Sequence, residues 1–280
     1  MEIKRVVLVM ADIGGYTRFL KLHTSSLLHA EVIIADLLEA VLDHTEHPLT
    51  LSKLEGDGAF LYVTLEAGGD PRAAAQDVLR QVAAFMDAFK VRERELIACM
   101  ACACEACQNI QQLKIKAFLH VGQTTIKKIH QFEDLGGEDP IVIHRLLKNS
   151  IPAKEYIVMT EAFYELSGGL AGQTPEARTE ECEGIGPVPI RVYYPIGEAP
   201  PLPPPLGPFS PKSAEYKALS ARFDAHTARR MQGREPPPNF AHLPNVRFTP
   251  FDWLRIVGEK VVFIVTDLPK ILREQRSRTR

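Results

Sequence analysis

The chain has no long apolar run, carries almost no net charge and has four of its five cysteines in one short segment. No stretch approaches the roughly 18–20 apolar residues that cross a bilayer, and the apolar residues 6–10 are too few for a signal-peptide core. A net charge of −2 over 280 residues offers no broad basic surface to nucleic acid. These absences predict a cytoplasmic protein that neither crosses a membrane nor binds nucleic acid.

Four of the five cysteines fall within nine residues, which favours a reducing compartment over a disulfide framework. As thiolates they would bind Zn²⁺ or an iron–sulfur cluster if the helix breaks there. Alanines separate them, and on a continuous helix the thiols would spread around more than one face. A second metal site and a helix of small residues therefore both remain open for Cys99, Cys102, Cys104 and Cys107.

Apolar periodicity predicts one large α+β domain. The expected strands are residues 3–10, 113–122, 156–159 and 190–194, with hairpins over 49–63 and 113–132. The expected helices are residues 16–44, a long helix from residue 70, 140–149 and 161–166. The order strand, helix, strand, strand, helix, strand is the split βαβ plan of ferredoxin-like folds.

Proline-rich segments at residues 200–205 and 236–238 indicate stiff linkers after this domain. We therefore expect a domain over residues 1–197 and a linker with a helical tail over 198–280. The end of the tail is basic. Docking on its own domain, on a partner protein or on an anionic membrane surface are the three interpretations, and interspersed acidic residues favour the first.

Two aspartates sit where phosphate chemistry would need them. Asp12 follows the first apolar strand, and Asp57 lies at the tip of a Gly-Asp-Gly hairpin. If the hairpin lies beside the strand, the carboxylates converge and can bridge two Mg²⁺ or Mn²⁺ ions about 3.5–4 Å apart. Aspartate before glycine is also ordinary turn chemistry, so the spacing alone does not decide between the two.

With these aspartates in this order, residues 3–197 resemble the catalytic domain of class III adenylyl and guanylyl cyclases. Residues 12–17, Asp-Ile-Gly-Gly-Tyr-Thr, resemble the family's Asp-Ile-x-Gly-Phe-Thr segment, and residues 120–122, His-Val-Gly, resemble its His-x-Gly strand end. Residues 134–146 align without gaps with its Asp-x-Trp-Gly-x-x-Val-Asn-x-Ala-x-Arg-Met stretch. The resemblance implies a ferredoxin-like cyclase domain.

The resemblance also implies roles for single residues. Asp12, Ile13 and Asp57 would hold two Mg²⁺ or Mn²⁺ ions per site. Lys53 and Asp134 fall on the two positions that select adenine, which implies ATP as the substrate.

The remaining catalytic positions lie further along the chain. Arg145 falls on the arginine that stabilises the pentavalent phosphorus, and Lys154 resembles a lysine that binds the triphosphate. One position departs from the family, because Ile141 stands where an asparagine orients the ribose.

By resemblance, the protein would be an adenylate cyclase, a phosphorus–oxygen lyase of signal transduction that converts ATP to cyclic AMP and pyrophosphate. In that family the aspartates and the arginine of one site come from different subunits, which implies a homodimer. Because Ile141 offers no hydrogen bond, weak activity is expected. The alternative is a catalytically inactive cyclase-fold protein that binds nucleotide as a regulatory or scaffolding module.

Overall fold

The computed structural model describes residues 2–16, 19, 27–65, 68–99, 109–129 and 132–195, together with residues 254, 258, 261 and 265. The chain divides into two compact units. The first comprises residues 1–15, 38–89 and 113–199, and the second comprises residues 16–37, 90–112 and 200–280. The expected boundary at residue 197 and the role of the tail stay predictions, because most of the tail lies outside the described residues.

An eight-stranded sheet forms the core of the first unit, with strand order β2-β3-β1-β4-β6-β8-β7 and β5 paired to β4. β1 is antiparallel to both β3 and β4, and β2 is antiparallel to β3, which is the ferredoxin-like arrangement. The predicted fold class is therefore confirmed. The strands are β1 Glu2–Gly14, β2 Thr50–Glu55, β3 Gly58–Thr64, β4 Lys114–Ile129, β5 Phe132–Gly136, β6 Tyr156–Thr160, β7 Glu176–Cys182 and β8 Gly186–Tyr193.

Four α-helices and one short 3₁₀-helix are described. They are α2 Leu27–Leu42, α3 Pro71–Cys99, α5 Glu138–Leu146, α6 Glu161–Ser167 and η2 Ile110–Gln112. The long helix α3 begins at Pro71 as predicted, since proline suits the first turn, and the Asp70 carboxylate accepts the Arg72 N–H over 2.9 Å. None of the described helices is both long and apolar enough to cross a bilayer.

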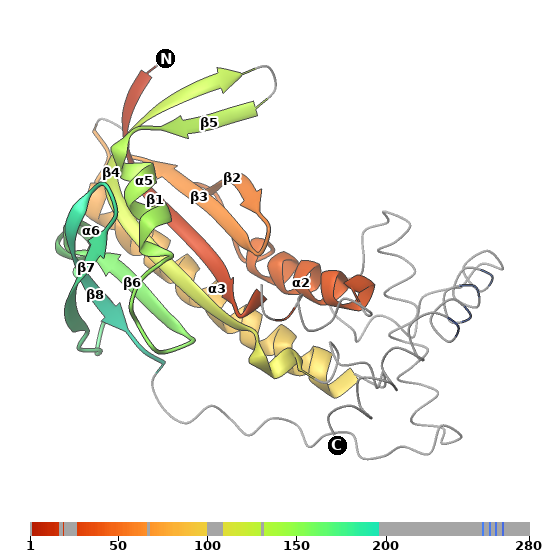
Figure 1. The fold of residues 1–280 in the computed structure, drawn as a ribbon. Coiled ribbons are helices and arrows are strands. Elements are labelled where there is room, and N and C mark those ends of the chain that lie inside the picture. The colour runs from red at the N-terminus through yellow and green to blue at the C-terminus, as the bar shows by residue number, and fades with distance from the viewer. Residues whose placement is uncertain are drawn as a thin grey trace. The chain divides into compact units, whose positions relative to one another are not determined.

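The central strand β1 is buried on both faces. Val6, Leu8 and Met10 belong to the core cluster that also contains the buried residues of α5. Figure 1 shows α5 lying across this face of the sheet, in front of β1 and β4. The alternate residues Val7 and Val9 are equally buried and point to the opposite face, behind which the first part of α3 runs in Figure 1.

The turn predicted within residues 113–132 is misplaced. β4 does not end near Gly122 but continues to Ile129, and its whole first part pairs with β1. The hairpin partner is β5, which follows rather than includes residues 124–129. Gly122 looked like a strand end, but the Asp139 carboxylate occupies the space that a Cβ there would need. The glycine therefore allows close packing and does not mark a turn.

Strand β7 was not predicted. Its residues are mostly polar and exposed, because it is an edge strand that pairs only with β8. An edge strand with few apolar residues gives no strong alternation to read.

The parts of α2 and α3 that belong to the second unit are joined by a buried ion pair. The Arg92 guanidinium lies 3.2 Å from the Asp36 carboxylate, which is fully buried, and 3.2 Å from Glu95 at the rim. A buried charge is tolerated only when it is paired, so this contact fixes the register between the two helices.

Candidate functional site

The backbone holds Asp12 beside Asp57. Asp12 pairs with Gly58 across β1 and β3, and the Ile13 N–H donates to the Asp57 carbonyl over 3.1 Å. A Cβ on Gly58 would lie only 3.1 Å from the Ala11 carbonyl, so glycine at this position lets the hairpin approach the strand closely. The predicted convergence of the strand end and the hairpin tip is present in the structure.

Burial perturbs the pKa of both carboxylates, and repulsion from Asp12 adds to the shift of Asp57. Burial raises the pKa of Asp57 to about 6, with the Asp12 charge as the second cause. Burial also raises the pKa of Asp12, and the Lys116 ammonium partly offsets this shift. Two adjacent carboxylates that resist ionisation together form a site that a cation would stabilise.

Lys116 brings a positive charge to this pair. It lies opposite Asp12 across β1 and β4, and its Nζ is 3.8 Å from Asp12 Oδ2. The same ammonium lies 5.7 Å from the centre of the Tyr156 ring. Lys116 was not among the predicted site residues, although its place in the alternating pattern of residues 114–120 already put it on one face with Phe118 and His120.

The residues present fit a divalent metal with oxygen ligands. Asp12 and Asp57 supply carboxylate oxygens, which Mg²⁺ and Mn²⁺ prefer, and Ile13, whose side chain is buried, could add only its backbone carbonyl. Within the part of the chain that the structure describes, no group of three or more His, Cys, Asp or Glu side chains is placed to hold a metal. Substrate phosphates and water would therefore complete the coordination, as is usual for Mg²⁺.

Lys53 is held by neighbouring side chains. Its ammonium lies 2.6 Å from Glu55 Oε1 and 5.7 Å from the centre of the Phe60 ring. The other oxygen of Glu55 lies 3.4 Å from His144 Nδ1, and His144 packs on Phe60 with the ring centres 5.0 Å apart. This cluster of four side chains joins the hairpin β2-β3 to helix α5.

Helix α5 presents Ile141 and Arg145 on one outward face. The two residues are four apart, whereas Val142, Ile143 and Leu146 are buried against the sheet. Ile141 is 48% exposed. The Arg145 guanidinium donates to Glu183 over 3.0 Å, and the Glu183 side chain is 85% exposed, so Arg145 is accessible to a ligand.

Asp134 and Lys154 lie on other segments of the chain than the aspartate pair. Asp134 is on β5 and forms an ion pair of 3.1 Å with Lys127 on β4. Lys154 is exposed in the segment before β6. The structure therefore brings together Asp12 and Asp57, while Lys53, Asp134 and Arg145 each pair with a different side chain.

Most of the cysteine cluster lies outside the described residues. Cys99 ends helix α3, and Cys102, Cys104 and Cys107 lie outside the described residues. The isolated Cys182 is buried in the core cluster beneath α5.

His120 anchors the start of α5. Its Nε2–H donates to Asp139 Oδ1 over 2.7 Å, and its Nδ1 lies 2.9 Å from the Thr160 hydroxyl. The second oxygen of Asp139 accepts the Gln123 N–H over 2.6 Å. The hydrogen bond from His120 is the main cause that lowers the pKa of Asp139, so this carboxylate stays ionised. The His-Val-Gly motif thus has a structural partner that the sequence did not reveal.

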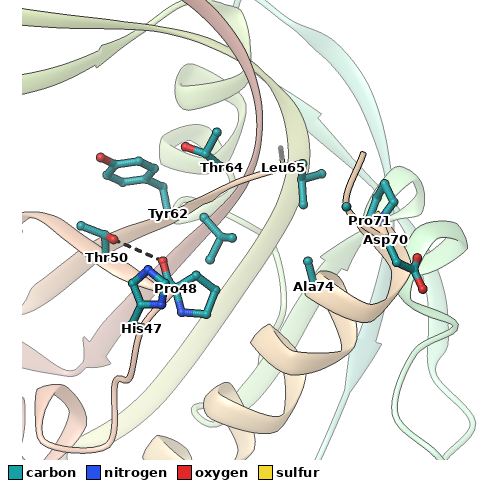
Figure 2. A pocket seen from close by; sticks show the side chains of 11 residues that line it. His47, Pro48, Thr50, Tyr62, Thr64, Leu65, Asp70, Pro71 and Ala74 are labelled. Atoms are coloured by element: carbon teal, nitrogen blue, oxygen red, sulfur yellow. Dashed lines mark hydrogen bonds between the residues drawn. The ribbon is translucent and has the colours of Figure 1, made fainter. Parts of the chain in front are cut away.

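A pocket of about 420 Å³ lies between the end of the hairpin and the start of α3 (Figure 2). Its lining includes Tyr62, Thr64 and Asp70. The Thr50 hydroxyl, also in the lining, already donates to the Pro48 carbonyl over 3.2 Å. None of the predicted site residues lines this pocket. The pocket is therefore separate from the candidate site at Asp12 and Asp57.

Comparison with solved structures identifies the fold. The adenylyl cyclase CyaB from P. aeruginosa matches over 69% of this chain and 96% of its own, with a TM-score of 0.50 and 17% identity. The guanylyl cyclase Cya2 matches over 72% of this chain and 97% of its own, with a TM-score of 0.51 and 13% identity. The protein has the fold of a class III adenylyl/guanylyl cyclase catalytic domain. Because one of these proteins is an adenylyl cyclase and the other a guanylyl cyclase, the shared fold does not indicate which nucleotide this protein would bind.

Sequence comparison places the chain more narrowly. An uncharacterized protein of Mycobacterium tuberculosis is 31% identical over 153 residues, which are 55% of this chain and 69% of the relative. The chain belongs to the same family as that mycobacterial protein. A family model described as a protein of unknown function (DUF2652) matches residues 34–156, which include Asp57 and Arg145 but not Asp12.

Proposed function

We propose that this protein binds ATP together with Mg²⁺ or Mn²⁺ and converts it to cyclic AMP and pyrophosphate. The observation that carries the proposal is the carboxylate pair of Asp12 and Asp57, which the hydrogen bond from the Ile13 N–H to the Asp57 carbonyl holds together. Burial, with the Asp12 charge as the second cause, raises the pKa of Asp57 to about 6. A fold that keeps two like charges side by side is typical of a site for a divalent cation.

Asp12 and Asp57, with the backbone at Ile13, would hold the metal ions. When bound, the metals would lower the pKa of the ribose 3′-hydroxyl and neutralise charge on the phosphates. The protein's own contribution is then positioning and charge stabilisation, which supply most of the catalysis of phosphoryl transfer.

Four side chains would act on the nucleotide. Lys53 and Asp134 would read the adenine, and Arg145 and Lys154 would carry positive charge to the phosphates. Support comes from the exposure of Lys154 and from the outward face of α5, which leaves Arg145 within reach of a ligand. The exposed ion pair with Glu183 is weak enough to yield to a phosphate group, which binds arginine through two parallel hydrogen bonds.

The separate partners of these residues favour a homodimer. Lys53, Asp134 and Arg145 each pair with a different side chain within one copy, whereas Asp12 and Asp57 adjoin each other. A head-to-tail arrangement would bring the outward face of α5 in one copy to the aspartates of the other. Two-fold symmetry would then build two identical sites.

A second candidate function is nucleotide binding without turnover. Ile141 lies on the same outward face as Arg145 and cannot donate a hydrogen bond. Loss of one such contact can lower the rate by roughly 10²–10³. A protein with this substitution would bind metal and ATP and act as a regulatory module.

Production of cyclic AMP and cyclic GMP from ATP and GTP with Mn²⁺ tests both candidates. Asp57→Asn and Arg145→Ala are the test variants, and the exposed Asp43→Asn and Lys148→Ala are their matched controls. Cyclic AMP that only the test variants abolish would establish the cyclase. Metal-dependent ATP binding without product would establish the second candidate, and absence of binding would refute both.

A further inference from the structure

Glu55 connects the hairpin to helix α5 with both of its carboxylate oxygens. Oε1 lies 2.6 Å from the Lys53 ammonium, and Oε2 lies 3.4 Å from His144 Nδ1. Lys53 and Glu55 are two residues apart on β2, and His144 immediately precedes Arg145 on α5. One carboxylate therefore links the residue that would read the base to the helix that carries the phosphate-binding arginine.

The Phe60 ring packs against both ends of this bridge, which is the link from Lys53 through Glu55 to His144. Phe60 lies opposite Lys53 across β2 and β3, and both the ammonium and the His144 ring pack on it. A lysine side chain has many rotamers, so fixing it costs conformational entropy. The carboxylate and the ring together restrict the ammonium before any ligand arrives, so part of this entropy is already lost in the free protein.

A fixed ammonium discriminates between purines more sharply than a mobile one. Adenine presents an unprotonated ring nitrogen on its Watson–Crick edge, which accepts a hydrogen bond, whereas guanine presents an N–H there. An ammonium is a donor only. When its place is fixed, the ammonium faces the acceptor of adenine and the donor of guanine at the same point. Two facing donors form no hydrogen bond, so guanine is penalised.

We propose that Glu55 and His144 are positioning residues for Lys53, and that the preference for ATP over GTP depends on this bridge and not on Lys53 alone. The inference rests on the proposed function, because it assumes that Lys53 faces the base. Neither Glu55 nor His144 touches the nucleotide in this arrangement. Glu55 acts on Lys53 directly, and His144 acts on Lys53 by orienting Glu55.

The test measures affinity for α,β-methylene-ATP and α,β-methylene-GTP by calorimetry in the presence of Mg²⁺. Neither nucleotide can release pyrophosphate, so turnover does not enter the result. Glu55→Gln is expected to reduce the ATP/GTP affinity ratio about tenfold, because the neutral amide no longer fixes the ammonium. His144→Phe keeps the packing on Phe60 but loses the contact with Glu55, and the ratio is expected to fall about threefold.

Two controls separate positioning from a general loss of structure. Glu138→Gln removes an exposed carboxylate of α5 and should leave the ratio unchanged. In a Lys53→Met background, Glu55→Gln should have no further effect on the ratio, because the two residues act as one unit. Glu55→Asp, which retains the charge on a shorter side chain, should restore part of the preference.

The possible results distinguish this inference from the proposed function. If the unaltered protein binds neither nucleotide, the proposed function is wrong and this inference falls with it. If the protein prefers ATP and Glu55→Gln keeps that preference, only the inference is overturned. An additive effect of Glu55→Gln in the Lys53→Met background would likewise show that Glu55 acts independently of Lys53.

Discussion

The Ile13 N–H donates to the Asp57 carbonyl over 3.1 Å, and this contact, with the pairing of Asp12 and Gly58, keeps two aspartates side by side. The hairpin cannot withdraw Asp57 from Asp12 without breaking the pairing of β1 with β3. The fold therefore maintains the charge repulsion even when no cation offsets it. We therefore expect that removing the charge of Asp57 would stabilise the metal-free protein but weaken cation binding. Such a trade-off between stability and function is common at functional sites.

Asp57→Asn is expected to stabilise the metal-free protein by about 1 kcal/mol at pH 7.5, after allowance for solvent screening of a partly exposed carboxylate. The native pKa of about 6 lies above the ordinary value of 3.8, so ionisation disfavours the folded state. This penalty is full above about pH 6 and fades as the pH falls toward 3.8. The gain measured by urea unfolding should therefore shrink at pH 4.

The matched control for this measurement is Asp43→Asn, which changes an exposed aspartate in the turn after α2. It should leave the free energy of unfolding within about 0.5 kcal/mol of the unaltered protein. Destabilisation by Asp57→Asn at pH 7.5 would mean that the carboxylate is a needed hydrogen-bond acceptor and not a strained ligand.

Affinity for Mn²⁺ should fall about tenfold between pH 7 and pH 5. Burial and the Asp12 charge raise the pKa of Asp57 to about 6, and a protonated carboxyl does not coordinate a metal. Water-proton relaxation, which detects bound Mn²⁺ directly, measures the affinity at each pH. A flat profile would place the metal elsewhere, and in Asp57→Asn the step near pH 6 should be absent.

Patterns within the sequence predicted most of the fold and part of the site. Asp12 and Asp57 could be found because each follows a strong local signal, an apolar strand and a Gly-Asp-Gly turn. The length of β4 could not be predicted, because Gly122 makes room for the carboxylate of Asp139, which lies on the later helix α5. Local patterns carry no information about such a contact between distant segments.

The side chains that tune the site were missed for the same reason. Lys116, Glu55 and His144 acquire their roles only when β4, β2 and α5 meet. The alternation of residues 114–120 did place Lys116 on one face of its strand. What it could not reveal was the register that sets this lysine opposite Asp12.

Lys116→Met is expected to tighten Mn²⁺ binding about threefold to tenfold at pH 8. The ammonium lies 3.8 Å from Asp12 Oδ2, and at an effective dielectric constant typical of such sites it repels an incoming cation appreciably. Methionine keeps the length that packs near Tyr156. The control Lys148→Met removes an exposed lysine after α5. Weaker Mn²⁺ binding by Lys116→Met would instead show that Lys116 orients Asp12.

Glu55→Gln is expected to lower the pKa of His144 further. Burial is the main cause that already holds this pKa below its ordinary value of 6.5, the Glu55 charge opposes the shift, and the Lys53 charge adds to it. Removing the carboxylate takes away the charge that opposes the shift, whereas Lys53→Met should raise the pKa of His144. NMR titration of the His144 ring protons measures both directions.

The control for the titration is Glu138→Gln, on the same helix as His144, which should leave its pKa unchanged. An unaltered pKa of His144 in Glu55→Gln would mean that the two side chains do not meet in solution. In that case the bridge between the hairpin and α5 would not exist.

Ile141→Asn should raise the rate of cyclic AMP formation about 10²-fold while ATP affinity changes little. The position is 48% exposed, so asparagine empties no core and costs only about 0.5 kcal/mol of helix propensity. An amide there could donate to the nucleotide bound beside Arg145, and a hydrogen bond made mainly in the transition state increases the rate and not the affinity.

A matched change elsewhere isolates this effect. Val91→Asn alters a 57% exposed apolar residue of α3 and should leave the rate unchanged. A rise confined to Ile141→Asn would show that the site is complete except for one hydrogen bond, which makes the present protein a slowed enzyme. If Ile141→Asn binds ATP and metal yet gains no activity, more than this contact is missing, and nucleotide binding without turnover becomes the function of the fold.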